Sequence, residues 1–239
     1  MDVGCSSSLD TYSIVENANY SFVELPLDTL AEIKDENFQD LIDKVKSFKI
    51  KPLVWSDLSE EYKLGEYAFS YVKKHIKDLC QKIDMLNGEY ITVRYEQSMF
   101  NTAPDDFVNT LIDISSVASS YGLEIILLIN GKNIDELVNN YKTISDLSID
   151  HPFLKYGVDF SGINDYDRFF DFVADNEVMG LESVIYYRIS ANDSNEDNFS
   201  EKLSGMINKL ADLNAMLCVW NNLDETLHKI MSNKYIYND

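Results

Sequence analysis

Five charged residues stand near the ends of short apolar segments, where their side chains could act together on one small molecule: Glu24, Arg94, Glu96, Asp159 and Arg188. A pair of carboxylates can move a proton to and from a carbon beside a carbonyl group, and guanidinium groups can hold the negatively charged oxygen that results. Glu24 and Glu96 are the candidate acid and base, and Arg94 and Arg188 are the candidate oxygen-binding pair. The alternative is structural, because charges inside a small barrel must pair with one another in any case.

Three uncharged residues are candidates for ligand contact beside these charges. Asn130 follows an apolar segment, and Trp55 and Trp220 each end one. An indole can form an apolar wall on which a sugar ring stacks, but aromatic residues at such positions also serve as ordinary core. Both interpretations remain open for the two tryptophans.

The charged residues are carried by short apolar segments that alternate with longer segments of helical period. The short segments are Asp2–Cys5, Phe22–Leu25, Pro52–Trp55, Tyr90–Tyr95, Ile125–Ile129, Tyr156–Phe160, Ser183–Ile189 and Met216–Trp220. Strict alternation of strand and helix requires parallel strands, and eight such units fit a closed barrel. We therefore predict an α/β fold, a single (β/α)8 barrel domain over residues 1–239. The alternative is an open, doubly wound sheet.

The segments between these strands have apolar residues three and four positions apart, which predicts helices. They are Asn37–Phe48, Glu60–Leu86, Pro104–Tyr121, Asn133–Leu147, Tyr166–Ala174, Phe199–Asn214 and Leu223–Met231. Residues 8–21 have room for a short helix. The acidic segment 192–198 is expected to be an extended loop.

Alternation along each strand predicts which side chains enter the barrel. Along 90–96 the apolar residues suit the helix-facing side, which leaves Thr92, Arg94 and Glu96 pointing inward. The same count places Glu24, Asp159 and Arg188 inside. All lie near the carboxyl ends of their strands, where barrel enzymes assemble their sites.

Charge limits the partners. Lys and Arg total 20 against 41 Asp and Glu, a formal net charge of −21. Such a chain repels phosphate backbones and anionic lipid surfaces, and it has no apolar segment of the roughly 18 residues that a membrane helix needs. We expect no nucleic acid and no membrane as partner. A small polar or anionic metabolite is compatible, because a few arginines set the local field of a pocket.

The cysteines and the start of the chain bear on the compartment. Cys5, Cys80 and Cys218 are odd in number and widely spaced, which fits neither a disulfide framework nor a zinc cluster. The first residues have no cationic and apolar pattern of a secretory signal. We expect reduced, buried thiols and a cytoplasmic protein.

The N-terminal segment resembles a known family. Residues 4–30 read GCSSSLDTYSIVENANYSFVELPLDTL, which is similar to the first two strand–helix units of xylose-isomerase-like sugar-phosphate isomerases and epimerases. The match is centred on Asn17–Leu25, and the order and lengths of the later units are compatible over essentially the whole chain. The resemblance implies a TIM barrel that acts on a sugar or sugar phosphate as an isomerase or epimerase.

The resemblance also implies a site for Mn²⁺, Mg²⁺ or a similar ion, held by Glu, Asp, His and Glu at the ends of strands five to eight. At these positions the chain has Leu127, Asp159, Arg188 and either Trp220 or Asn221. The three histidines do not replace the missing ligands: His75 and His228 fall in predicted helices, and His151 precedes a proline at the other end of a strand. We therefore expect no bound metal and no cofactor, with a guanidinium supplying positive charge instead.

Two classes of function follow. One is an isomerase or epimerase that works without the metal of the family, with Glu24 and Glu96 moving protons. The other is a non-catalytic descendant that binds a metabolite or a protein. Fold does not decide between them.

Overall fold

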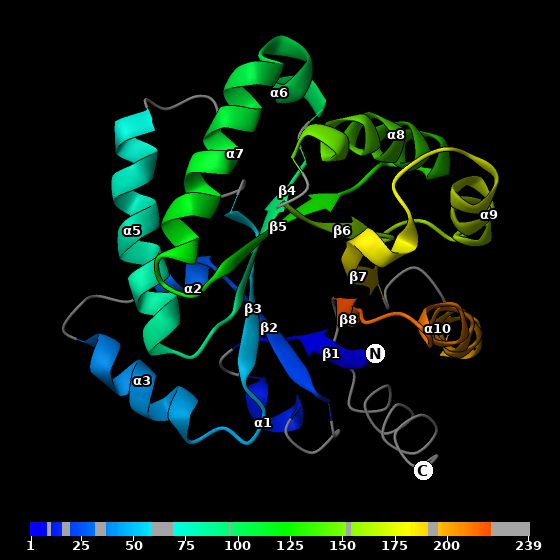
Figure 1. The fold of residues 1–239 in the computed structure, drawn as a ribbon. Helices are drawn as coiled ribbons and strands as arrows, with labels where there is room; N and C mark the ends of the chain where they lie inside the picture. The colour runs from blue at the N-terminus through cyan, green and yellow to red at the C-terminus, as the bar shows by residue number, and fades with distance from the viewer. Residues whose placement is uncertain are drawn as a thin grey trace.

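The computed structural model describes residues 1–8, 11–15, 20–31, 37–58, 69–95, 97–151, 154–190 and 196–220. Eight strands form a closed barrel in chain order, with β8 beside β1 and every neighbouring pair parallel. Figure 1 shows the strands at the centre and the longer helices around them. The predicted (β/α)8 barrel is confirmed, and the open sheet is excluded.

Each predicted strand is present, and its ends differ from the prediction by one residue at most. The strands are β1 Asp2–Ser6, β2 Phe22–Pro26, β3 Pro52–Ser56, β4 Tyr90–Arg94, β5 Glu124–Ile129, β6 Lys155–Asp159, β7 Val184–Ser190 and β8 Met216–Trp220. The boundaries agree because each strand is an apolar run that must be buried against helices.

The described helices are α1 Tyr12–Val15, α2 Asp28–Ala31, α3 Phe38–Lys46, α5 Phe69–Met85, α6 Gln97–Thr102, α7 Pro104–Ser119, α8 Ile134–Asp150, α9 Asp167–Asp175, the 3₁₀ helix η2 Leu181–Ser183 and α10 Glu196–Leu210. Across these ranges, none is long and apolar enough to cross a bilayer. The helix predicted at 223–231 lies outside the described residues. The short elements α2, α6 and η2 were not predicted.

The expected loop at 192–198 is wrong in its last part, because α10 begins at Glu196. Acidic residues favour the first turn of a helix, where the backbone N–H groups carry partial positive charge. Residues 191–195 lie outside the described part of the chain.

Helix α7 illustrates how sequence determines the outer layer. Pro104 occupies its first turn with two aspartates, both favourable at a helix start. Phe107, Leu111 and Ile114 then recur on one face, and all three are buried against the strands. The amphipathic pattern therefore directs this helix onto the barrel.

The barrel interior changes from apolar to charged along its axis. An inner cluster, separate from the layer beneath the helices, is formed by Phe22, Val54, Ile126, Leu128, Tyr186, Met216 and Cys218. Two residues further along their strands, toward the carboxyl ends, Glu24 follows Phe22 and Arg188 follows Tyr186. The alternation of β-strand side chains thus places buried charge directly above an apolar plug.

The three cysteines, Cys5, Cys80 and Cys218, are buried and form no disulfide. Burial raises the pKa of the Cys80 thiol to about 12, so this thiol is protonated and poorly reactive at neutral pH. Their placement is that of packing residues.

A close contact inside the barrel gives a test of the interior packing. A Cβ atom at Gly4 would lie 2.5 Å from the ring of Phe22, which is fully buried. We expect Gly4→Ala to lower the free energy of unfolding by about 1–3 kcal/mol, because the ring must shift in a closed interior. Urea denaturation measures the change. The control is the same substitution in a Phe22→Leu background, where its cost should shrink. An equal cost in both backgrounds would contradict this packing.

Candidate functional site

The centre of the candidate site is the guanidinium of Arg188, on β7, whose side chain has no exposed surface. It contacts three carboxylates from different parts of the barrel. Nη2 lies 2.5 Å from Glu24 Oε1, and Nη1 lies 3.2 Å from Asp57 Oδ2 and 3.4 Å from Asp159 Oδ2. One cation thereby links β2, the residue after β3, and β6.

Arg94, at the end of β4, adds a second guanidinium that is partly exposed at 22%. Its Nη2 lies 2.9 Å from Asp57 Oδ2 and 3.9 Å from Asp159 Oδ2. The Thr92 hydroxyl donates to the other oxygen of Asp57 at 2.7 Å. Asp57 therefore bridges the two arginines.

Two aromatic residues complete the surroundings of Arg188. The Tyr186 hydroxyl donates a short hydrogen bond to Glu24 Oε2. The guanidinium carbon of Arg188 lies 5.0 Å from the ring centroid of Trp220, a cation–π contact. The guanidinium thus has carboxylates around its edge and an indole on its face.

The charges reinforce one another. Burial raises the pKa of Asp57, but Arg188, Arg94 and the Thr92 hydrogen bond outweigh burial and hold that pKa below its ordinary value. Burial lowers the pKa of Arg188, but Glu24 and Asp57 raise it well above the ordinary value, so the guanidinium stays charged. These five side chains form what we call the ionic layer: Glu24, Asp57, Asp159, Arg94 and Arg188. With all of them ionised, three carboxylates and two guanidiniums give the layer a net charge of −1.

A cavity of about 470 Å³ opens above the ionic layer, at the carboxyl ends of β4, β5, β6 and β8. Its volume is within the range of small-molecule sites. The lining residues are Arg94, Tyr95, Gln97, Asn130, Gly131, Lys132, Glu136, Asn140, Asp159, Ser161 and Trp220. The cavity therefore combines an indole wall with many hydrogen-bonding groups.

Four of the residues proposed from the sequence line this cavity: Arg94, Asn130, Asp159 and Trp220. Glu24 and Arg188 are fully buried beneath them and do not belong to the lining. Direct contact of these two with a ligand, as expected from the sequence, is therefore not supported by this geometry. Glu96 lies outside the described residues.

The structure corrects the ligand-binding role expected of Trp55. Val54 belongs to the inner cluster, so the neighbouring Trp55 points the other way, into the core beneath the helices. A Cβ atom at Gly88 would lie 2.6 Å from its indole nitrogen, which shows how closely Trp55 packs there. Because it is fully buried on the helix side, Trp55 is a core residue and no part of the cavity.

Asp57 was missed by the sequence analysis. It follows β3 directly, and its carboxylate is the one that contacts both arginines. The available signal was an acidic residue at the carboxyl end of a strand, the same signal that identified Asp159. Alternation gave no guidance, because the strand has already ended at Ser56.

No family model and no curated protein matches the sequence. Solved structures do match. A xylose isomerase domain containing protein from Salmonella typhimurium LT2 has a TM-score of 0.66 at 9% identity, covering 98% of this chain and 96% of that one. D-psicose 3-epimerase with D-tagatose from Clostridium cellulolyticum H10 has a TM-score of 0.63 at 10% identity, covering 97% of this chain and 89% of that one. The chain shares the eight-stranded barrel fold of these proteins. An AP endonuclease, family 2, from Brucella melitensis also matches, with a TM-score of 0.62 at 11% identity, covering 96% of this chain and 97% of that one.

The described residues at the ligand positions that the resemblance implies do not fit a divalent ion. Leu127, expected at the first ligand position, faces the helices, and the inward residue of β5 beside Arg94 is Leu128, which is equally unable to bind metal. Within the described ranges, no three His, Cys, Asp or Glu side chains are grouped to hold an ion. The carboxylates present surround a guanidinium instead. Asn221 lies outside the described residues.

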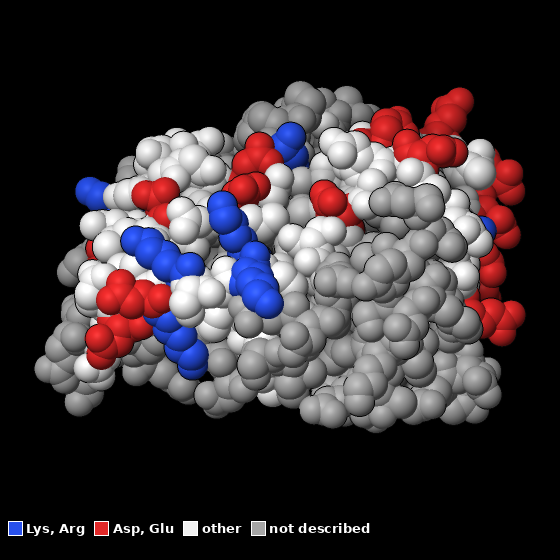
Figure 2. Space-filling model, turned by 90° about the horizontal axis from the view of Figure 1, so that it is seen from below, with Lys and Arg blue, Asp and Glu red and all other residues white. Residues whose placement is uncertain are grey.

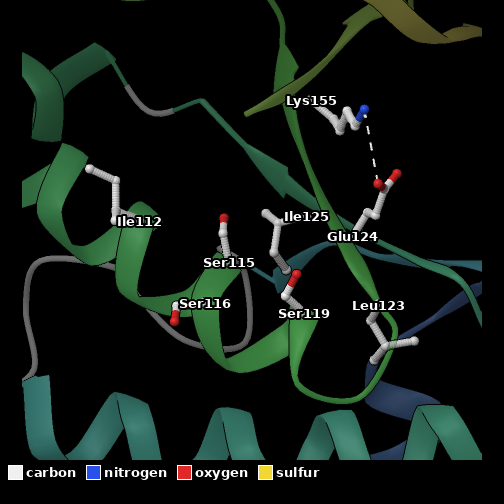
Figure 3. Close-up of a pocket in the computed structure, with 8 residues that line it drawn as sticks. All are labelled: Ile112, Ser115, Ser116, Ser119, Leu123, Glu124, Ile125 and Lys155. Atoms are coloured by element: carbon white, nitrogen blue, oxygen red, sulfur yellow. Dashed lines mark ion pairs between the residues drawn. The ribbon is translucent and has the colours of Figure 1, made fainter. Parts of the chain in front are cut away.

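A second cavity, of about 230 Å³, lies at the opposite end of the barrel (Figure 3). Three serines of α7 line this cavity together with residues at the start of β5, and Lys155 lies 3.9 Å from Glu124 in an exposed ion pair. It lies at the amino ends of β5 and β6, whereas catalytic residues of TIM-barrel enzymes gather at the carboxyl ends. The cavity above the ionic layer is therefore the candidate site.

The burial of Arg188 predicts a large cost for its removal. We expect Arg188→Met to lower the free energy of unfolding by about 3–5 kcal/mol at pH 7, because three buried carboxylates lose their cation. The matched control is Arg168→Met. Arg168 lies 2.5 Å from Asp135, but the two side chains are 56% and 73% exposed, so this loss should stay within about 1 kcal/mol. Urea denaturation at equilibrium measures both.

The difference in the free energy of unfolding between the wild type and Arg188→Met should become smaller as the pH falls from 7. The lowered pKa of Asp57 stabilises the wild type above the ordinary Asp pKa of about 3.9, and this contribution disappears as the pH falls through the lowered value. In the variant, protonation relieves the repulsion among the carboxylates. Equal losses for Arg188→Met and Arg168→Met at pH 7 would contradict the central position of Arg188.

Proposed function

We propose that this chain binds a small, polar, carbohydrate-type ligand in the cavity above the ionic layer, without a divalent metal ion. The supporting observation is the composition of the cavity wall. Trp220 offers an apolar ring face, while Asn130, Asn140 and Ser161 offer hydrogen-bonding groups around it. Sugars need this combination, because one face of the ring is apolar and its edge carries hydroxyl groups.

The charge of the site favours a neutral ligand over an anion. Arg94 and Lys132 in the lining are offset by Glu136 and Asp159. With Arg188, Glu24 and Asp57 beneath, three positive and four negative charges leave −1. An added phosphate or carboxylate would therefore meet net repulsion from the site as well as from the chain as a whole.

Nucleic acid is a poor candidate, although one structural neighbour is named as an AP endonuclease. The net charge of the chain is −21. On the face in Figure 2, the described basic side chains are interleaved with acidic ones, and acidic side chains gather along one edge. A phosphate backbone needs a continuous basic path.

Isomerisation or epimerisation of the bound sugar is a second candidate function. Asp159 and Arg94 favour it, because a carboxylate and a guanidinium at the floor of one cavity can move a proton and stabilise an enolate oxygen. The burial of Glu24 counts against it. This carboxylate is occupied by Arg188 and Tyr186 and has no exposed surface from which to reach a substrate carbon. Ligand binding without catalysis is consistent with the same geometry.

We expect the purified protein to bind at least one of D-tagatose, D-psicose and D-fructose more tightly than D-fructose 6-phosphate. Calorimetric titration should give the same affinity in EDTA and in Mn²⁺. Trp220→Ala should weaken binding about tenfold, or roughly 1.4 kcal/mol, because the ring face is lost, and Trp220→Phe should retain most of it. Chromatography of the same mixtures detects any epimer formed.

The control for this titration is Lys155→Ala, at the opposite end of the barrel, which should bind as the wild type does. Binding that requires Mn²⁺ would contradict the metal-independent proposal. Failure of all three neutral sugars to bind would contradict the carbohydrate proposal itself.

A further inference from the structure

In the side-chain amide of Asn140, on α8, the nitrogen has a hydrogen-bond partner, whereas the oxygen has none among the described residues. The residue lines the cavity and is only 2% exposed. Its Nδ2 donates to the main-chain oxygen of Asn130 at 2.7 Å, and only the nitrogen of an amide can donate to a carbonyl, so the orientation is determined. Among the described residues, Oδ1 is buried and has no hydrogen-bond partner.

Ser161, after β6, presents a second such atom in the same cavity. Its main-chain N–H donates to Asp159 Oδ1 at 2.8 Å, which holds the residue in place. Its hydroxyl oxygen is buried, again with no partner in the described part of the chain. Native proteins satisfy nearly all of their buried polar atoms. Two unsatisfied atoms in one cavity therefore indicate a partner outside the described residues, and a ligand in the cavity would supply it.

The frame that carries Asn140 is tightly packed. A Cβ atom at Gly131 would lie 2.4 Å from the main-chain nitrogen of Leu137, so the loop after β5 lies directly against α8 and leaves no room for a side chain. At the start of α8, the Asn133 side chain accepts from the Glu136 N–H at 3.0 Å. The Asn140 amide is thus held in position before any ligand arrives, which limits the entropic cost of binding.

The chemistry of these atoms defines the complementary group. Asn140 Oδ1 can only accept a hydrogen bond, the Asp159 carboxylate also accepts, and the Ser161 hydroxyl can do either. A ligand group facing Asn140 Oδ1 or the Asp159 carboxylate must donate. A sugar hydroxyl donates, whereas an ionised phosphate or carboxylate offers only lone pairs and would be repelled by Oδ1 and by Asp159.

We propose that Asn140 and Ser161 form a hydroxyl-recognition subsite, in which Asn140 Oδ1 accepts a hydrogen bond from a ligand hydroxyl and thereby selects neutral polyhydroxy ligands over anions. This inference rests on the proposed function, since it concerns the same cavity. It assigns the selectivity to two buried atoms that have no hydrogen-bond partner among the described residues.

The test compares Asn140→Leu, Ser161→Ala and the control Asn139→Leu by NMR titration with D-tagatose, D-psicose and D-fructose. Asn139 is the exposed neighbour of Asn140 on α8. We expect Asn140→Leu to bind at least tenfold more weakly than the wild type, Ser161→Ala several-fold more weakly, and Asn139→Leu equally well. Ser161→Ala removes a hydroxyl that has no partner in the described part of the chain, so the melting temperature of this variant should stay at or above that of the wild type.

Two outcomes overturn the inference in distinguishable ways. If the wild type binds a sugar and both Asn140→Leu and Ser161→Ala bind it within twofold, the subsite does not exist, while the proposed function stands. If the wild type binds none of the three sugars, the proposed function fails and the inference fails with it. If Asn140→Leu does not fold, Ser161→Ala decides alone, because the Ser161 hydroxyl has no hydrogen-bond partner within the described ranges.

Discussion

The guanidinium of Arg188 determines how the carboxyl end of this barrel is built. Three buried carboxylates would repel one another if they stood alone, and a single cation draws them together from β2, from the end of β3 and from β6. The arrangement leaves a charge of −1 with Arg94 included, so the floor of the cavity is close to neutral. Loss of the central cation from such a cluster leaves buried carboxylates without their counter-charge, which is strongly destabilising.

This arrangement changes what the fold can do. Barrels with eight parallel strands place ligand sites at the carboxyl ends of the strands, and the cavity of this protein lies there. The positive charge at its floor belongs to a fixed side chain that cannot exchange or be chelated. Trp220 both covers Arg188 and lines the cavity, so it joins the ionic layer to the ligand space.

The fold could be predicted from the sequence because the burial of apolar residues determines it. Each strand is an apolar run, and the alternation along β4 correctly assigned Ile91 and Val93 to the helix side. Trp55 was proposed for the site because it ends an apolar segment, and Leu127 was placed by the family resemblance; alternation could correct neither. In an all-apolar strand such as β3 or β5, alternation carries no contrast, and an error of one residue reverses every side chain.

The site itself could be predicted from the sequence only in part. Asp57 lies beyond the end of β3, where strand geometry no longer predicts direction. The roles of Asn140 and Ser161 depend on contacts between α8, the loop after β5 and the loop after β6, which no local pattern encodes. The inward charges Glu24 and Arg188 were found, but their distance from the cavity depends on the depth at which each strand places them.

The most direct test of this account is a crystal structure of the protein soaked with Mn²⁺ and D-tagatose, with data collected at the manganese absorption edge. We expect the Arg188 guanidinium among Glu24, Asp57 and Asp159, no anomalous peak within bonding distance of these carboxylates, and sugar density between Trp220 and Asn140. A manganese peak coordinated by these carboxylates, with Arg188 displaced, would contradict it.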